Sequence, residues 1–216
     1  MALTIRSAQT IRNGVTLQGT LPPPPVPTLP YLFELDASTY TSGTTWNDIS
    51  GQGHNAELYG GITWDSEAGG CFVFPGETSK YIDVPGSEAG WGLTSATPNA
   101  SFSVWTKITG PSYYQHIAGW RGGIDFWFLI LSGQSTTEAR FGGTVNYYDV
   151  NMDYGPYFGN WAHVTFTLDV NAGIEVLYIN GVNVGQATGL SGNFISESSN
   201  FRLGCDTGNN FAMTGR

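Results

Sequence analysis

The sequence predicts an all-β protein, an antiparallel two-sheet sandwich preceded by an extended N-terminal arm. Glycine accounts for 30 of 216 residues, charged residues for only 12% and aromatic residues for 14%. From residue 31 onward, runs rich in β-branched and aromatic residues are separated by clusters of Gly, Asn, Asp and Ser. No stretch shows the apolar spacing of an amphipathic helix, so the whole body is predicted to be β.

Each predicted strand is a short run bounded by turn residues. The run 161–168 alternates between apolar and polar residues, whereas 124–131 is apolar throughout, as a buried central strand is. Asn180-Gly181 lies between two such runs and predicts a two-residue hairpin turn. The predicted strands cover residues 31–36, 70–74, 81–84, 101–108, 124–131, 139–148, 161–168, 174–179, 182–184 and 201–205.

Charge and hydropathy argue against two classes of partner, nucleic acids and membranes. The formal net charge is −9, and residues 1–30 contain no acidic residue. The acidic remainder lacks the clustered Lys and Arg that nucleic-acid binding needs. No apolar run approaches the roughly 18 residues of a membrane span, and the N-terminus has no signal-peptide pattern. The protein is therefore expected to be made in a cytoplasm and to bind neither nucleic acid nor membrane.

The two cysteines, Cys71 and Cys205, lie in apolar strand-like runs. One pair of cysteines does not make a disulfide framework. Free Cys behaves as a small hydrophobic residue and is commonly buried. Two buried free thiols are therefore predicted in preference to a disulfide.

Composition divides the chain into an extended β arm at 1–20, a proline-rich linker at 21–30 and a sandwich at 31–216. In the arm, the triplet Thr-Ile-Arg occurs twice, and Asn13-Gly14 after the second copy predicts a hairpin turn. So short a hairpin is not stable alone, so it lies on its own body or on a neighbouring subunit, or it is a frayed terminus. The predicted assembly residues are Thr4, Ile5, Arg6, Thr10, Ile11 and Arg12.

The linker contains six prolines in ten residues. Such a composition favours extended polyproline II, a semi-rigid spacer of roughly 30 Å at this length. We therefore expect it to hold the arm at a distance from the sandwich.

Three segments of the sandwich resemble the laminin-G-like, concanavalin-A-like lectin/glucanase family. They are the strand 102–107, the hairpin formed by 160–169 and 175–181, and the strand 201–204. The resemblance covers about residues 31–211. It implies a concanavalin A-like jelly-roll fold and a lectin-like surface.

A narrower resemblance links residues 35–38, 43–51 and 69–74 to modules of tailed-bacteriophage virion proteins. It implies a structural protein of the virion, either a capsid decoration or a part of a tail fibre or baseplate. The expected partners are other virion proteins, bound through the arm, and further copies of the chain in a homo-oligomer. Family members continue beyond the position of Arg216 with a strand that pairs near the first one. Either the sequence is a fragment or the sandwich lacks this strand, and in the second case a neighbour's arm is the expected filler of the gap.

Hydrolysis of glycosides needs two carboxyl groups about 5–5.5 Å apart in a retaining enzyme. The glucanase pattern places them two residues apart on one strand face, as Glu-x-Asp-x-(x)-Glu. Glu34 and Asp36 match its first part, but Ser38 and Thr39 stand where the second Glu is required. The chain is therefore expected not to be an enzyme.

Calcium is the cofactor that the resemblance allows, because laminin-G-like modules often hold it at a rim with Asp, Asn and backbone oxygens. Two loops are rich enough in Asp, Asn and Gly to do so. The same residues also make ordinary turns, and both interpretations stay open. The candidate ligands are Asp48, Asn55, Asp206 and Asn209.

Glycan binding requires aromatic faces that are exposed near polar side chains, so that a sugar ring can stack on them. Aromatic residues outside the predicted core are the candidates. Tyrosine is also enriched at subunit interfaces, and that alternative stays open. The candidates are Trp91, Tyr113, Tyr114, Tyr147, Tyr148 and Tyr154.

Overall fold

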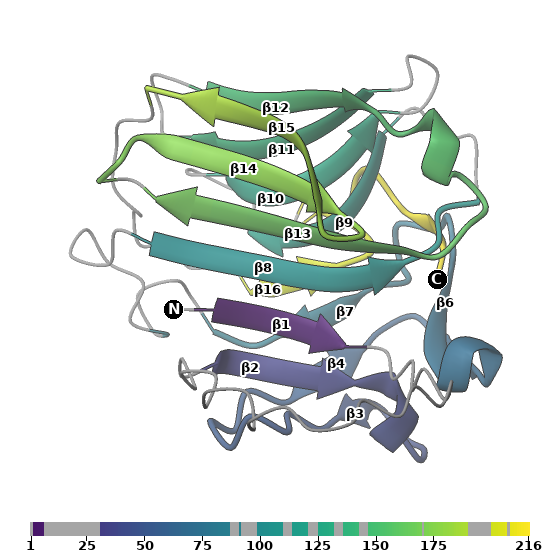
Figure 1. Cartoon of the computed structure of the whole chain (residues 1–216). Helices are drawn as coiled ribbons and strands as arrows, with labels where there is room; N and C mark the ends of the chain where they lie inside the picture. Colours follow the sequence, from purple (N-terminus) through teal and green to yellow (C-terminus); the bar gives the residue numbers. More distant parts are fainter. Residues whose placement is uncertain are drawn as a thin grey trace, which may run out of the picture.

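Two β-sheets pack face to face in the computed structural model of the chain (Figure 1). Its described residues are 2–6, 31–86, 91, 99–109, 114–120, 125–131, 136–142, 147–169, 171–189, 200–206 and 208–216, some of them by backbone alone. The predicted all-β sandwich is confirmed. None of the helices in these ranges is long and apolar enough to cross a membrane.

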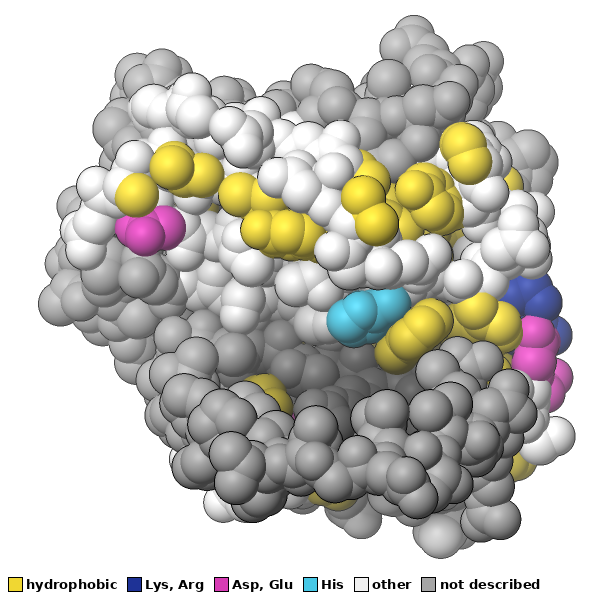
Figure 2. Space-filling view, viewed as in Figure 1, with side chains coloured by type: hydrophobic (Ala, Val, Ile, Leu, Met, Phe, Trp, Pro, Cys, Tyr) yellow, Lys and Arg dark blue, Asp and Glu magenta, His cyan; other side chains and the backbone are white. Residues whose placement is uncertain are grey.

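The first sheet has six strands in the order β15-β14-β13-β8-β1-β2. Its central strand β13 alternates strictly between buried and half-buried residues, which is the period of a strand with one face on a core. Figure 2 shows mainly hydrophobic and uncharged polar side chains, and few charged ones, on the described part of its outer face. The strands are β1 (Ala2–Arg6), β2 (Tyr31–Asp36), β8 (Asn99–Thr106), β13 (Ala162–Asp169), β14 (Ile174–Ile179) and β15 (Val182–Thr188).

The second sheet has eight strands in the order β12-β11-β10-β9-β16-β7-β4-β3. A third, small sheet closes one end in the order β17-β6-β5. The eight strands are β3 (Thr45–Trp46), β4 (Ala56–Leu58), β7 (Ile82–Val84), β9 (Tyr114–Trp120), β10 (Asp125–Leu131), β11 (Thr136–Gly142), β12 (Tyr147–Asp153) and β16 (Phe201–Leu203). The small sheet is formed by β5 (Thr63–Asp65), β6 (Cys71–Pro75) and β17 (Thr214–Gly215).

Helical structure in the described part of the chain is limited to short 3-10 turns. Asp36 caps the first, because its Oδ1 accepts the Ser38 N–H at 2.8 Å. The turns are η1 (Ala37–Thr39), η2 (Glu67–Gly69) and η4 (Gly155–Tyr157). This agrees with the absence of helical periodicity in the sequence.

The predicted single strand 139–148 is wrong. The structure divides it between β11 and β12, which pair antiparallel from Thr136↔Asp153 to Gly142↔Tyr147. Gly142-Gly143 inside the predicted run is the turn signal that marks this division. The strands β3, β4, β5, β9 and β17 were not predicted, because most of them are too short to show a period.

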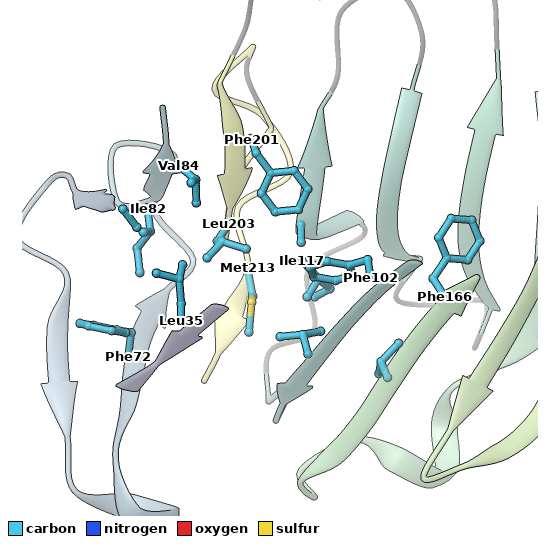
Figure 3. Close-up of a cluster of buried hydrophobic side chains, with 14 of the residues drawn as sticks. Leu35, Phe72, Ile82, Val84, Phe102, Ile117, Phe166, Phe201, Leu203 and Met213 are labelled. Atoms are coloured by element: carbon cyan, nitrogen blue, oxygen red, sulfur yellow. The ribbon is translucent and has the colours of Figure 1, made fainter. Parts of the chain in front are cut away.

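The core lies between the two large sheets (Figure 3). Leu35, Phe102 and Phe166 point inward from the six-stranded sheet and meet Ile117 and Phe201 from the opposite one (Figure 3). All five are at most 3% exposed. Burial of each such side chain is worth about 1.5–3 kcal/mol, which makes this shared layer the main stabilising contact between the sheets.

The arm of the same chain completes the six-stranded sheet. Strand β1 pairs in parallel with β2 on one side and with β8 on the other. Thr4, Ile5 and Arg6 are thereby placed in the sandwich, where the chain's own arm lies beside its first strand. The second triplet, Thr10, Ile11 and Arg12, and the predicted turn lie outside the described residues.

The last residues of the chain are tied to the sandwich. Thr214 and Gly215 pair with β6, and Arg216 exchanges backbone hydrogen bonds of 2.8 and 2.9 Å with Lys107. Both cysteines are buried and free, as predicted.

Candidate functional site

A groove of about 320 Å³ opens beside the ends of β4 and β7 and the loop after β16. Backbone pairing brings its walls together, because Tyr59 N–H donates to Tyr81 C=O at 2.9 Å just beyond the β4–β7 ladder. Gly60 has φ +67°, and a side chain there would collide with the Ser79 carbonyl. The groove is lined by Tyr59, Gly60, Thr78, Ser79, Tyr81 and Asn209.

An aromatic pair forms one wall of the groove. The Tyr59 and Tyr81 rings are stacked, with centroids 4.9 Å apart and planes inclined by 21°. Tyr59 is 37% exposed, one of the few large apolar side chains in the described residues with so much accessible surface. A partly exposed ring that is held by a second ring is a ready stacking surface.

Arg202 holds this pair from behind. Its guanidinium carbon lies 3.7 Å from the centroid of the Tyr81 ring, a cation–π contact. Its Nε donates to Asp83 Oδ1 at 2.6 Å, and its Nη2 to Asp83 Oδ2 at 3.2 Å. Nη1 donates to Asn209 Oδ1 at 2.9 Å and to the Asp206 carbonyl at 3.0 Å. These hydrogen bonds fix the position of the Arg202 guanidinium, against which the tyrosine pair packs.

Hydrogen bonds raise the pKa of both Tyr59 and Arg202 beside the groove. The hydrogen bond from Tyr59 Oη to Glu57 Oε2, 2.8 Å long, raises the pKa of Tyr59 to about 12. Burial lowers the pKa of Arg202, but the hydrogen bonds to Asp83 outweigh it and the net direction is up. With its donors bound to Asp83, Asp206 and Asn209, Arg202 offers little to an anionic ligand.

The groove therefore combines an aromatic face with short uncharged polar side chains. Thr78, Ser79 and Asn209 carry hydroxyl and amide groups that can donate and accept hydrogen bonds. An aromatic ring faces the C–H side of a sugar, and such polar groups bind its hydroxyls. Chemically, this arrangement suits a neutral saccharide.

Two of the predicted sugar-stacking residues are buried, so the prediction that their rings are exposed is wrong. Trp91 is 5% exposed and packs edge-on against Phe33 at 5.2 Å. Tyr154 is fully buried between Tyr157 and Phe158, and burial raises the pKa of its hydroxyl. Both rings belong to the hydrophobic core, where their large apolar area is covered.

The remaining predicted tyrosines do not share a site at one end of the sheet. Tyr114 pairs with Leu131 at one end of β10, whereas Tyr148 pairs with Phe141, which itself pairs with Phe126 near the other end. Tyr147 is the neighbour of Tyr148 on β12. Only the backbones of these strand residues are described, and Tyr113 lies outside the described residues.

Asp48, one of the predicted calcium ligands, has its oxygens occupied by hydrogen-bond donors. Oδ1 accepts the N–H groups of Glu34 and Ser50, both at 2.8 Å. Oδ2 accepts the Ser50 hydroxyl at 2.8 Å and the His54 N–H at 3.0 Å. Burial by itself would raise the pKa of Asp48, but these donors lower it and the net direction is down. Asn55 Oδ1 is likewise bound, to the Asp48 N–H at 2.9 Å.

In the second predicted calcium loop, the candidate ligand oxygens also accept hydrogen bonds. Asp206 is 1% exposed, and its Oδ1 accepts the Asn210 N–H at 2.6 Å. Asn209 Oδ1 is bound to the cationic Arg202, which disfavours a second cation beside it. Among the described residues, no group of three or more His, Cys, Asp or Glu could hold a metal ion. The turn-forming interpretation accounts for the hydrogen bonds of both loops.

Sequence reasoning missed the pair at the centre of the groove. Tyr59 and Tyr81 are separated by 21 residues, and Tyr81 was assigned to a predicted strand. The local signal was Tyr59-Gly60-Gly61, an aromatic residue directly before a glycine turn, which is where a ring at a strand end stays accessible. Asn209 was predicted, but as a metal ligand.

Comparison with known proteins agrees with the observed architecture. The family model described as concanavalin A-like lectin/glucanases superfamily matches residues 76–216, well over half of the chain. A search of curated proteins found no match.

Among solved structures, domain 4 of AbnA is similar to this chain. That protein is a GH43 extracellular arabinanase from Geobacillus stearothermophilus, and the domain was solved in complex with arabinotriose. The likeness has a TM-score of 0.60 at 20% identity and covers 78% of this chain and 82% of that one. The CBM40 of Ruminococcus gnavus IT-sialidase is also similar, with a TM-score of 0.46 at 16% identity, over 56% of this chain and 73% of that one.

Proposed function

This chain belongs to the concanavalin A-like lectin/glucanases superfamily, and we propose that it is a carbohydrate-binding module whose ligand lies in the Tyr59–Tyr81 groove. The stacked tyrosine pair is the observation that carries the proposal, since Tyr59 remains 37% exposed beside hydroxyl and amide groups. A sugar that stacks on this ring gains apolar burial without losing its hydroxyl hydrogen bonds.

The proposed ligand is a neutral saccharide. Arg202 lies 3.7 Å from the Tyr81 ring centroid, and its donors bind Asp83, Asp206 and Asn209. Lys80, between Ser79 and Tyr81 in the chain, is paired with Glu77 at 3.2 Å. Glu57 adds negative charge next to the Tyr59 hydroxyl. An acidic sugar would therefore meet carboxylates without gaining a free cationic partner.

The test is titration of the intact protein with neutral oligosaccharides, first from a glycan array and with arabinotriose as a defined probe. Tyr59→Ala removes the exposed ring but leaves the Asp83–Arg202 pair in place. We expect it to weaken binding at least about tenfold, which corresponds to 1.4 kcal/mol.

The matched control is Trp64→Ala. Trp64 is 40% exposed and does not line the groove, so its loss should change affinity less than about twofold. Circular dichroism establishes that each variant is folded. Equal losses in both variants, or no binding to any neutral glycan, would overturn the proposal.

We propose binding without hydrolysis. Asp36 is occupied as the cap of η1, and the second glutamate of the glucanase pattern is absent from positions 38 and 39. Incubation with a bound oligosaccharide should release no reducing ends. Release that disappears in Glu34→Gln would show an enzyme.

The second candidate function is that of a virion structural protein, a capsid decoration or a tail-fibre or baseplate component. The resemblance of residues 35–38, 43–51 and 69–74 to phage virion modules supports it, as does an arm that forms strand β1 of a sheet. A decoration that binds host surface glycan would combine both functions. Detection of the chain in purified phage particles by mass spectrometry tests this role, and its absence from them would exclude it.

A further inference from the structure

Asn209 lines the tyrosine groove with an amide whose orientation is set by Arg202. The residue is exposed and has a φ of +57°, a backbone conformation that Asn tolerates better than most residues. Its Oδ1 accepts a hydrogen bond from Arg202 Nη1 at 2.9 Å. A guanidinium only donates hydrogen bonds, so the amide turns its oxygen toward Arg202. The NH2 group is therefore the part of this side chain that remains for a ligand.

Arg202 cannot turn away to release this amide. Its Nε and Nη2 bind the two oxygens of Asp83, and the side chains of the pair are 11% and 6% exposed. Its Nη1 also donates to the Asp206 carbonyl at 3.0 Å. A flipped Asn209 amide would place its NH2 against these donors and lose a charge-assisted hydrogen bond. The groove thus keeps a fixed donor at this position.

The other polar side chains of the groove have different chemistry. Thr78, Ser79 and Tyr81 carry hydroxyl groups, which rotate and can both donate and accept. Within the described part of the chain, these hydroxyls make no hydrogen bond to the protein. They suit the hydroxyls of a sugar, which also do both. The NH2 of Asn209 only donates, so its best complement is an oxygen that only accepts.

We propose that the groove takes a neutral saccharide with an acetamido group, whose carbonyl oxygen accepts a hydrogen bond from Asn209 Nδ2. This inference rests on the proposed function, because it names the ligand class of the same groove. A carbonyl oxygen carries no hydrogen and projects from the sugar, whereas the ring and glycosidic oxygens are recessed in it. The acetamido methyl adds apolar surface for the Tyr59 ring, which is 37% exposed. The group adds no charge beside Glu57 and Asp83.

The experiment compares sugars that differ in one substituent, by NMR titration of the intact protein. One pair is N-acetylglucosamine and glucose, the other N-acetylgalactosamine and galactose, all as methyl glycosides. In at least one pair, we expect the acetamido sugar to bind about fivefold more tightly or better, which is the worth of one typical hydrogen bond.

Asn209→Asp tests the donor without disturbing its support. Asp has nearly the same shape, tolerates the same backbone conformation and still offers an oxygen to Arg202. An oxygen in place of the NH2 would repel the acetamido carbonyl, whereas a sugar hydroxyl can donate to it. The preference should therefore fall below about twofold, while glucose and galactose keep their affinity.

The matched control is Asn183→Asp, which adds the same charge at an exposed position of β15 that does not line the groove. It should keep the full preference. Circular dichroism establishes that each variant is folded.

Two results would overturn the inference, namely equal binding within both sugar pairs by the wild type, or a preference that survives in Asn209→Asp. In either case, binding that Tyr59→Ala weakens would leave the proposed function standing. Failure of every neutral sugar to bind would remove the proposed function and this inference with it.

Discussion

At the scale of single residues, the Asp48 carboxylate holds a loop together by accepting hydrogen bonds. Its two oxygens accept three backbone N–H groups and one hydroxyl from Glu34, Ser50 and His54. These donors connect β2 to a glycine-rich segment that has no regular structure of its own. A charged acceptor is suited to this role, because hydrogen bonds to an ionised group are the strong ones.

Asp48→Asn should lower the free energy of unfolding by about 2–3 kcal/mol at neutral pH, because the amide that replaces one oxygen would face N–H donors. Urea denaturation measures the change. Glu77→Gln is the control, since its carboxylate is 55% exposed in a pair with Lys80 and should contribute less than about 0.5 kcal/mol. Addition of a chelator should leave the wild-type transition unchanged, whereas a calcium site at Asp48 would lower it.

The pH dependence of this contribution has a definite sign. The folded pKa of Asp48 lies below its ordinary value of 3.8. The contribution is therefore fully present above pH 3.8 and is lost as the pH falls through the lower folded pKa. The difference between wild type and Asp48→Asn should shrink only in strong acid. A difference that stays constant throughout strong acid would contradict an ionised acceptor.

At the scale of elements, the conformation of one hairpin turn places the edge strand of the six-stranded sheet. Asn180 and Gly181 connect β14 to β15 with φ values of +51° and +80°. Two consecutive positive φ values define the type I′ turn, whose twist matches that of the strands. Asn-Gly is the dipeptide that adopts it most readily, which is why this turn could be predicted from two letters.

Gly181→Val should lower the free energy of unfolding by about 1–2 kcal/mol, the cost of a left-handed backbone at a residue with a Cβ. No atom lies within 4 Å of the added Cβ, so the effect would report backbone strain and not a collision. Chemical denaturation measures it. Gln186→Ala on the exposed part of β15 serves as control and should stay within about 0.5 kcal/mol. An unchanged Gly181→Val would argue against the I′ turn.

At the scale of the whole molecule, both thiols report on the integrity of the sandwich. Cys71 and Cys205 are 4% and 0% exposed. Burial raises the pKa of the Cys205 thiol to about 11, so almost none of it is the reactive thiolate at neutral pH. Their accessibility therefore depends on opening of the core.

We expect a thiol-specific colour reagent to label no cysteine in the native protein and both after unfolding in denaturant. The rate of labelling should follow the population of unfolded molecules, since opening limits it. Reducing agent should not change the thermal midpoint. Rapid labelling of either cysteine under native conditions would show that the region around it opens independently of the sandwich.

The sequence by itself determined the features that depend on neighbouring residues. Period-two alternation identified β13, and Asn180-Gly181 identified a hairpin, because side-chain direction and turn conformation are local properties. The free state of the thiols followed from their apolar contexts. The laminin-G-like segments identified the family, since they span a strand, a hairpin and a second strand.

Only the tertiary structure decided which aromatic residues are accessible and where the arm lies. Trp91 is buried against Phe33 and Phe201, which are distant in sequence, whereas Tyr59 is left exposed on Tyr81. The groove joins residues just after β4, just before β7 and in the loop after β16, and β1 is inserted between strands that begin at Tyr31 and Asn99. Contacts over such separations depend on how the two sheets pack, which no local pattern encodes.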